Sequence, residues 1–569
     1  MAQQRIADTN ARTANGGLAI SMRVGVFFCQ KPWQQHALYT PHAIALRTAN
    51  QTYTWQQLAN RIDAYAFAMQ QQGLQNQDVL TLVGKNSLEL VFIYLASLKL
   101  GVICAITMPQ PVMLLKQKLS TLYGENQPHW LWLGEGAKLE ESELTSLLAE
   151  ANIRLFNHEH VTHEHVTHEH VTHEHVTHEH VTHEHVTHEH VTHEHVTHEH
   201  VTHEHVTHEH VSPPTSAMVN KAESQSFASI IFTSGSTGVP KAVIHTFQQH
   251  WSSASGLLEV FSFSCHDTWL LSLPMYHVSG LAIIYRWLVA GACLKVGSGD
   301  LTQDIIHVTH ASLVATQLKR LLDSKTPLAL THVLLGGGHI PNHLAQQAAK
   351  HGIETWVGYG MTEAASTVTA KRVNASQSVG HVLPKRQVKL QGQRIFIGGE
   401  TMASGYYQQG LITPFVDEQG WFDSQDLGYW QNDELFIIGR VDNQFISGGE
   451  NIHCEEIEAV LSHHPDIALA MVIPVHDDEF GARSVALLQC QTMPKKEALE
   501  QWLNGKLERF KYPIDYFLIP NHSSETGIKI SRKTLKTWLT EHQLRYRPLN
   551  ERSPFDGLVL PIHKTDGLI

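Results

Sequence analysis

The chain has 569 residues, of which 42% are hydrophobic and 17% charged, a composition that favours a globular protein with more than one domain. The formal net charge of −13 is misleading, because eleven glutamates fall within one low-complexity stretch and the rest of the chain is close to neutral. This balance does not point to nucleic acid or to an acidic membrane surface as a partner. No apolar run predicts a transmembrane helix, so we expect no stable membrane insertion.

The six cysteines are scattered along the chain without a C-x-x-C pair. Their pattern indicates neither a disulfide framework nor a thiolate metal site, and it is typical of a reducing compartment, so we expect a cytoplasmic protein. Residues 1–30 are polar and irregular and are predicted to be a flexible extension. They lack the apolar core of a secretory signal, and Met22 is an alternative start to Met1.

The first predicted helix follows Thr54. Thr54 and Gln57 have the spacing of a capping box, and apolar residues then recur at helical spacing as far as Met69. Gly73 is placed to end this helix, because glycine is the usual residue just beyond a helix C-terminus.

Two strands are predicted next, over residues 78–83 and 102–106. They flank a helix that Ser87 caps and that ends near Gly101. Strands that alternate with helices favour a parallel sheet in an α/β domain.

Ten copies of the unit Val-Thr-His-Glu-His then run from Val161 to His210, directly after a His-Glu-His segment. A five-residue period matches neither helix nor strand, so we interpret residues 158–210 as a low-complexity insertion in a surface loop. Such an expansion is tolerated because long loops cost little closure entropy. More than half of the 43 histidines lie here, so a tract that binds zinc, nickel or copper is the alternative. The spacing does not match H-E-x-x-H.

A phosphate-binding loop is predicted between two apolar runs, where the sequence reads Thr-Ser-Gly-Ser-Thr-Gly-Val-Pro-Lys. Glycines and small hydroxyl residues let backbone N–H groups converge on an anion, and the lysine adds a positive charge. The loop is not a Walker A loop, because two residues separate its second glycine from the lysine and a strand follows. An ordinary surface turn is the alternative. The candidate residues are Thr233, Ser234, Gly235, Ser236, Thr237, Gly238 and Lys241.

This nonapeptide resembles the signature loop of the acyl-adenylate-forming (AMP-binding) enzymes, which include acyl-CoA synthetases, luciferases and adenylation domains. Further stretches resemble the same family in the same order, and they cover residues 273–280, 333–338, 358–363, 420–428, 439–452 and 527–532. The resemblance implies an α/β fold with a large N-terminal domain of parallel and mixed sheets with flanking helices. A smaller mobile α+β domain follows. The implied bounds are 31–439 for the large domain, 440–545 for the small one and 546–569 for a tail.

The resemblance assigns the nucleotide-binding residues. The turn at Gly336 and Gly337 would lie along the adenine, since glycine lets a flat ligand approach the backbone. Tyr359 would stack on the base, Thr362 would contact the α-phosphate, and Glu363 would hold Mg²⁺, which prefers carboxylates together with phosphate oxygens. A strand-end turn with a solvated glutamate is the alternative to this reading.

The resemblance also assigns residues around the boundary between the two implied domains. Asp426 would accept hydrogen bonds from both ribose hydroxyls, and Arg440 would reach the ribose. Asp442 would be the hinge, and Gly448 and Gly449 would pass beside the pantetheine chain of coenzyme A. In the Asp426 stretch, a glutamine stands where the family has a small residue.

Two further residues receive catalytic roles by resemblance. Lys529 would be the catalytic lysine, although one residue separates it from Gly527 where the family has none. An ordinary surface lysine is the alternative. His277, in a Pro-x-x-His segment, would shape the boundary between the acyl site and the thiol tunnel, whereas a packed core histidine is the alternative.

The resemblance implies ATP, Mg²⁺ and coenzyme A as the small molecules used. A carboxylate would attack the α-phosphate of ATP to give an acyl-adenylate and pyrophosphate, and the CoA thiol would then attack the adenylate. Such catalysis rests on positioning and charge stabilisation. No nucleophile triad is evident in the sequence, the partners are small molecules, and a homo-oligomer is left open.

Several stretches are most similar to the o-succinylbenzoate–CoA ligases of menaquinone biosynthesis, namely residues 241–246, 270–280, 309–318, 445–451 and 527–532. Their substrate carries a second carboxylate, which must be paired if it is buried. Arg286 is the candidate partner, whereas a helix arginine that reaches solvent is the alternative. Thr316 and Gln317 are further candidates for the substrate site.

Three other functions stay open. Another acyl- or aryl-CoA synthetase would keep every motif and change only the acyl site. A carrier-loading adenylation domain would share the first half-reaction, but no carrier domain is evident. A histidine-rich metal-binding protein on an inactive scaffold is the alternative of a different class, and the intact Glu363, Asp426, Arg440 and Lys529 argue against it.

Overall fold

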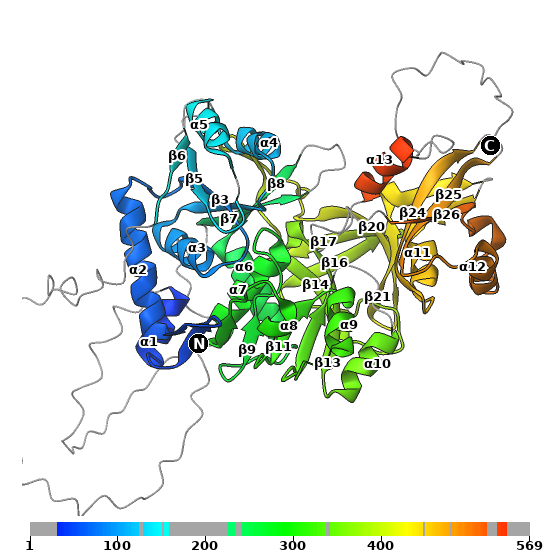
Figure 1. Ribbon diagram of the computed structural model, residues 1–569, viewed down its shortest axis with the longest axis horizontal. Coiled ribbons are helices and arrows are strands. Elements are labelled where there is room, and N and C mark those ends of the chain that lie inside the picture. Colours follow the sequence, from blue (N-terminus) through cyan, green and yellow to red (C-terminus); the bar gives the residue numbers. More distant parts are fainter. Residues whose placement is uncertain are drawn as a thin grey trace, which may run out of the picture.

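A computed structural model describes residues 31–124, 129–137, 139–150, 153–158, 226–233, 240–324, 326–336, 342–447, 450–477, 480–519 and 532–542. The predicted extension and tail, the repeat and the centre of the phosphate loop lie outside these residues. Within the described segments, no helix is both long and apolar enough to span a bilayer. The fold is mixed α/β, as predicted (Figure 1).

The first large sheet has eight strands and carries the phosphate loop. Its strands, in spatial order, are β19 (Leu411–Thr413), β18 (Gly405–Gln408), β8 (Lys241–Thr246), β7 (Phe227–Thr233), β4 (Ile103–Thr107), β3 (Val79–Val83), β5 (His129–Leu133) and β6 (Ile153–Leu155). From β7 to β6 neighbouring strands are parallel, whereas β7 and β8 form an antiparallel pair. The predicted parallel sheet is therefore confirmed, and the predicted strands lie within one residue of β3 and β4.

The second large sheet has nine strands. In spatial order they are β15 (His381–Val382), β14 (Ser366–Arg372), β13 (Glu354–Met361), β12 (His332–Leu335), β11 (His310–Leu313), β9 (Thr268–Leu270), β10 (Cys293–Lys295), β1 (Ile44–Arg47) and β2 (Thr52–Thr54). The central strands are parallel, and β13 turns back into β14 as an antiparallel pair. That turn carries the predicted magnesium ligand.

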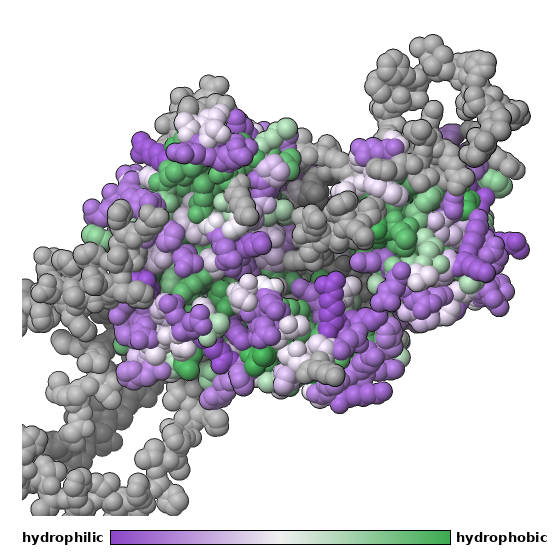
Figure 2. All heavy atoms as spheres, in the orientation of Figure 1, coloured by the Kyte–Doolittle hydropathy of each residue, from purple (hydrophilic) through white to green (hydrophobic). Residues whose placement is uncertain are grey.

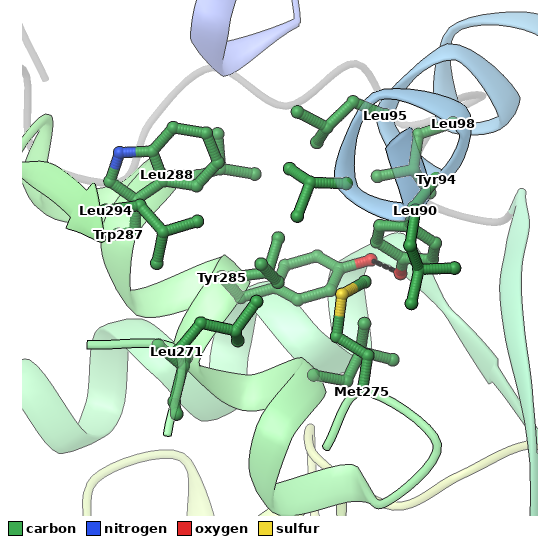
Figure 3. Packing of buried hydrophobic residues seen from close by; sticks show 14 of the residues in the cluster. Leu90, Tyr94, Leu95, Leu98, Leu271, Met275, Tyr285, Trp287, Leu288 and Leu294 are labelled. Atoms are coloured by element: carbon green, nitrogen blue, oxygen red, sulfur yellow. Dashed lines mark hydrogen bonds between the residues drawn. The ribbon is translucent and has the colours of Figure 1, made fainter. Parts of the chain in front are cut away.

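The helices of this part are α1 (Pro32–Tyr39), α2 (Trp55–Gln71), α3 (Leu88–Leu100), α4 (Val112–Leu122), α5 (Glu141–Glu150), α6 (Phe247–Leu258), α7 (Val278–Ala290), α8 (Leu301–Asp304), α9 (Ala315–Asp323) and α10 (Asn342–Lys350). Residues of α3 and α7 share one hydrophobic core with strands of both large sheets. Most side chains of both helices are apolar and buried, as expected of helices inside a core. In Figure 3, the hydroxyls of Tyr94 and Tyr285 meet inside this core, 2.8 Å apart.

The predicted helix caps are confirmed. Thr54 Oγ1 accepts from the Gln57 backbone N–H (3.3 Å), and Gln57 Oε1 accepts from the Thr54 N–H (2.9 Å). Gly73 has a φ of +99°, and the N–H of Leu74 donates to the carbonyl of Met69. Ser87 caps α3 through the Leu90 N–H.

The remainder of the chain forms smaller sheets, and the segments after His453 lie at one end of the molecule (Figure 1). A four-stranded antiparallel sheet contains β16 (Arg386–Gln391), β17 (Arg394–Gly399), β20 (Phe422–Gln431) and β21 (Glu434–Arg440). It is followed by β22 (Gln444–Ser447), β23 (Glu450–His453), β24 (Ile467–Asp477), β25 (Gly481–Cys490) and β26 (Asp515–Leu518), with α11 (Cys454–Ser462), α12 (Lys496–Leu503) and α13 (Arg532–His542). Elements after β21 have their own buried clusters.

Hydrophilic side chains are widespread on the face shown in Figure 2 and gather over α10 and α12. The hydrophobic side chains of the described residues appear there as smaller patches between them. This is the surface expected of a chain whose large apolar residues are mostly buried.

Candidate active site

The two ends of the phosphate loop lie opposite each other in the sheet. Thr233 is the last residue of β7, Lys241 is the first of β8, and the two are paired across the strands. The predicted strand–loop–strand arrangement is therefore confirmed. The Lys241 ammonium group lies over the ring of Tyr406, 4.8 Å from its centroid.

The turn between β13 and β14 holds Thr362 and Glu363 in a short 3₁₀ segment, Thr362–Ala364. Residues that belong to the other large sheet, or lie just before it, hold this turn. His245 Nε2 lies 2.7 Å from the Thr362 carbonyl oxygen, and the Ala403 N–H donates to the Glu363 carbonyl (2.8 Å). The Tyr406 hydroxyl donates to Glu363 Oε1 (3.2 Å). The two sheets are thus joined at the predicted metal ligand.

The electrostatics of these contacts are set by burial. Burial lowers the pKa of His245 to about 4, so the ring is neutral near pH 7 and Nε2 carries the proton donated to the carbonyl. Burial, assisted by the charge of Glu363, raises the pKa of the Tyr406 hydroxyl. That hydroxyl is therefore a donor at neutral pH, and the Glu363 carboxylate is the acceptor.

The donor set fits a magnesium ion that is bound together with a nucleotide. The Glu363 side chain is half-buried, and Oε1 accepts from a neutral hydroxyl. In the part of the chain that the structure describes, no group of three histidine, cysteine or acidic side chains could hold a metal alone. Mg²⁺ commonly takes one or two carboxylates and completes its shell with phosphate oxygens and water, which matches this arrangement.

The predicted base- and ribose-binding residues meet at one point. The Tyr359 hydroxyl donates to Asp426 Oδ2 (2.6 Å), and Arg440 Nη1 donates to Asp426 Oδ1 (3.2 Å). Asp426 and Arg440 are cross-strand partners on β20 and β21. Burial and the neighbouring carboxylate raise the pKa of Tyr359 well above its usual value, which keeps it a donor. The structure thus brings Tyr359, Asp426 and Arg440 together, while their contacts with base and ribose stay predictions.

Two glycines differ in the space around their backbone. Among the described residues, a Cβ atom added at Gly336, directly after β12, would meet no atom within 4 Å. A Cβ at Gly280, in the first turn of α7, would lie 2.1 Å from the Pro274 carbonyl oxygen. Gly280 therefore lets α7 pack on the segment that carries His277, which is half-buried at the start of the helix.

Arg286 is buried inside the large domain, with 2% of its surface exposed. Its guanidinium group lies 5.3 Å from the centroid of the Trp269 ring and hydrogen-bonds to two hydroxyls, Ser312 Oγ (3.5 Å) and Thr367 Oγ1 (3.3 Å). Within the described residues, Arg286 Nε has no hydrogen-bond partner. Burial, together with the charge of Arg386, lowers its pKa to about 9. The alternative that this side chain reaches solvent is therefore wrong.

The other two substrate-site candidates lie at the start of α9. Gln317 Oε1 accepts from the Val314 N–H (3.0 Å), so this side chain is used to cap the helix. Thr316 is half-buried beside it. Among the three candidates, Arg286 is the buried charged group.

The residues around Arg440 connect the last strands of the four-stranded sheet to α11 and α13. Asn443 Nδ2 donates to Glu455 Oε1 (2.6 Å), and Arg532 Nη1 lies 3.2 Å from the same oxygen. Arg532 also pairs with Glu458. Arg532, which lies three residues after the predicted catalytic Lys529, is thus bound to α11.

Several predicted site residues lie outside the described residues, so their roles stay predictions. They are Ser234, Gly235, Ser236, Thr237, Gly238, Gly337, Gly448, Gly449 and Lys529.

Two residues at this site did not emerge from the sequence. Tyr406 is 43 residues from Glu363 and reads as an ordinary strand tyrosine. His245 is 117 residues from Thr362, and although it lies in the stretch 241–246 that is similar to the ligases, the sequence predicted no role for it.

Comparison with known proteins gives a consistent result. Residues 33–407 match the family described as AMP-binding enzyme, and residues 456–526 match the AMP-binding enzyme C-terminal domain. The chain is 36% identical to the 2-succinylbenzoate–CoA ligase of Haemophilus influenzae, over 90% of this chain and 98% of that protein. It is 44% identical to the Salmonella typhimurium 2-succinylbenzoate–CoA ligase, over 58% of this chain and 72% of that protein. Among solved structures, an arginine-to-lysine variant of E. coli MenE with bound OSB-AMS superposes on this chain with a TM-score of 0.72. The two chains are 32% identical, and the match covers 91% of this chain and 99% of that one.

Proposed function

Because the chain belongs to the AMP-binding enzyme family, we propose that it is a 2-succinylbenzoate–CoA ligase of menaquinone biosynthesis. It activates o-succinylbenzoate as an acyl-adenylate and transfers the acyl group to coenzyme A. The observation that carries this proposal is the similarity to the H. influenzae ligase over 98% of that protein's length. The E. coli protein that binds OSB-AMS, which matches 91% of this chain, supports it.

In the first half-reaction, a carboxylate oxygen of the acid attacks the α-phosphorus of ATP. The bond from this phosphorus to the bridging oxygen breaks, and pyrophosphate leaves with the electron pair. Thr233, Thr362 and Lys241 bind the phosphates, and Lys529 stabilises the charge that develops on them. Because no covalent enzyme intermediate is needed, positioning and charge stabilisation supply the rate enhancement.

Glu363 holds Mg²⁺, which neutralises negative charge on the phosphate oxygens when it is bound. Tyr359 stacks on the adenine, while Asp426 and Arg440 bind the ribose. Their existing hydrogen bonds hold all three side chains in place before the nucleotide arrives.

In the second half-reaction, the CoA thiolate attacks the acyl carbon and AMP leaves. The small domain, which we begin at Arg440, rotates about Asp442 for this step, a hinge-type change. Rotation removes Lys529 and brings Gly448 and Gly449 beside the pantetheine chain, while His277 borders the thiol path.

Arg286 pairs with the ring carboxylate of o-succinylbenzoate. A buried carboxylate needs a charged or hydrogen-bonding partner, and Arg286 is a buried cation whose side-chain hydrogen bonds go to neutral hydroxyls. Thr316 lies on α9, close in sequence to Ser312, and is a second contact for the acid.

ATP–pyrophosphate exchange across a panel of carboxylic acids tests this function, with mass detection of the CoA product. Exchange and thioester formation with o-succinylbenzoate alone are expected. Exchange with a different acid would keep the mechanism and replace the substrate. Folded protein that exchanges with no acid would favour a histidine-rich binding protein on an inactive scaffold. We place the reaction in the cytoplasm, where its small-molecule partners ATP and CoA are available.

A further inference from the structure

Tyr406 lies between the two charged groups of the phosphate site. It is on β18, which pairs with β8, and its cross-strand partner Val243 is two residues from Lys241. Its hydroxyl donates to Glu363 Oε1 (3.2 Å), and the Lys241 ammonium group lies 4.8 Å from its ring centroid. A single side chain therefore contacts the carboxylate predicted to hold the metal and the lysine at the end of the phosphate loop.

We propose that Tyr406 is a positioning residue that sets the geometry of both Glu363 and Lys241 for the magnesium complex of ATP. The proposal deepens the proposed function, because it rests on the role of Glu363 as the metal ligand.

The hydroxyl orients the carboxylate. The backbone of the Glu363 turn is held by His245 and Ala403, but those bonds leave the side-chain torsions free. The bond from Tyr406 fixes one carboxylate oxygen, so the other is directed away from the tyrosine. Partners of this kind, which orient a metal ligand without touching the metal, typically contribute 10–100-fold to metal affinity or activity.

The ring orients the lysine. A cation above an aromatic face is attracted by the negative potential of that face. The Tyr406 ring also packs against the ring of Phe415, and the two ring centroids lie 4.9 Å apart. Since the lysine side chain has four rotatable carbon–carbon bonds, this contact restricts where its charge is found.

The neighbouring tyrosine provides a matched control. Successive side chains of a strand point to opposite faces. Tyr407 therefore points away from Tyr406, into the hydrophobic cluster beneath the sheet. Its hydroxyl bonds to the backbone of Gly410. Tyr407→Phe thus removes one hydroxyl from the same strand without touching Glu363 or Lys241.

The test measures binding of Mn²⁺, as a paramagnetic probe for the magnesium position, by electron paramagnetic resonance. It uses the full chain with ATP and without any acid, so no turnover occurs. Tyr406→Phe should weaken Mn²⁺ binding roughly tenfold, as expected for the loss of such an orienting bond, while Tyr407→Phe stays within twofold of the wild type. Tyr406→Leu should also weaken ATP binding in the absence of metal, because it removes the ring beneath Lys241.

Two results would overturn the proposal. The first is wild-type Mn²⁺ affinity in Tyr406→Phe, and the second is an equal loss in Tyr407→Phe. If Tyr406→Leu does not fold by circular dichroism, the phenylalanine variant decides. Because no acid is present, these outcomes are independent of which acid the enzyme uses.

Discussion

Arg286 is a buried cation whose hydrogen bonds go to neutral hydroxyls. A buried guanidinium group loses most of its hydration, and two long hydrogen bonds to hydroxyls replace only part of it. Replacing a buried charged group with an apolar one of similar volume is often neutral or stabilising. The proposed role of Arg286 in binding the ring carboxylate can therefore be tested separately from its contribution to folding.

Arg286→Leu should separate these two roles. We expect catalytic efficiency with o-succinylbenzoate to fall on the order of 100-fold, because the variant loses a charge-assisted bond to the ring carboxylate. The free energy of unfolding should be unchanged or higher. Steady-state kinetics and urea denaturation measure the two quantities.

The control for this variant is a second substrate. An analogue without the ring carboxylate, 4-oxo-4-phenylbutanoate, lacks the group that Arg286 is proposed to pair with, so its weak residual reaction should be the same in Arg286→Leu and in the wild type. A parallel loss with both acids would contradict the assignment of Arg286 to the ring carboxylate.

Lys529 gives a second prediction for a single residue. Lys529→Ala should abolish adenylate formation, since the lysine is expected to stabilise charge on the phosphate oxygens. The same variant should still convert supplied o-succinylbenzoyl-adenylate to the CoA thioester. Pyrophosphate exchange and thioester formation measure the two steps separately, and an equal loss in both would refute this role.

Individual elements were predictable from sequence where the signal is local. The capping residues Thr54, Gln57 and Ser87 act within three residues of their own position, and Gly73 ends α2 through its own backbone conformation. The strand–loop–strand around the phosphate site was predictable for the same reason. Each of these features is decided by neighbours in the chain, which the sequence displays directly.

The contacts between elements were not predictable in this way. The bond from Tyr406 to Glu363 and the bond from His245 to Thr362 connect the two large sheets. Their existence depends on the order of strands in each sheet, which no periodic pattern specifies. Likewise, the burial of Arg286 depends on how α6 and strands of the nine-stranded sheet pack against α7, and a helix arginine gives no sign of that.

The connection between β6 and β7 predicts what deletion of the repeat will do. These strands are separated by β5, β3 and β4, a distance of roughly 19 Å at the usual spacing of about 4.8 Å. Removing residues 161–210 leaves about 17 residues between the described ends, and these can span about 55 Å. We therefore expect folding and turnover to be unchanged.

This deletion should begin at Val161, because His158 packs within the fold. Its Nδ1 accepts from the indole N–H of Trp132 (3.1 Å). Melting temperature and pyrophosphate exchange of the deleted protein are the measurements. A loss of turnover with the melting temperature retained would mean that the repeat contributes to catalysis.

At the scale of the whole molecule, buried neutral histidines couple folding to pH. Burial lowers the pKa values of His245 and His310 to about 4 and that of His250 well below its usual range. Between pH 6.5 and pH 4 the unfolded chain therefore binds more protons than the folded one. Stability must fall as the pH is lowered through this window.

The size of this effect can be predicted for one residue. For His310, the pKa falls from 6.5 in the unfolded chain to about 4 in the folded one. Lowering the pH from above 6.5 to below 4 should therefore reduce the free energy of unfolding by about 3 kcal/mol through this residue. Urea denaturation near pH 7 and pH 5 measures the slope, which should be smaller in His310→Gln. Equal stability of the wild type at the two pH values would contradict this prediction.

The stacking of Arg286 over Trp269 also has an optical consequence. An indole with a cation on its face has its emission set partly by that charge, and the pair lies 5.3 Å apart. An anion that pairs with Arg286 alters the field at the ring. Under the proposed role of Arg286, Trp269 would serve as a built-in fluorophore for binding of the acid, and subtracting the spectrum of Trp269→Phe would isolate its signal from the other eleven tryptophans.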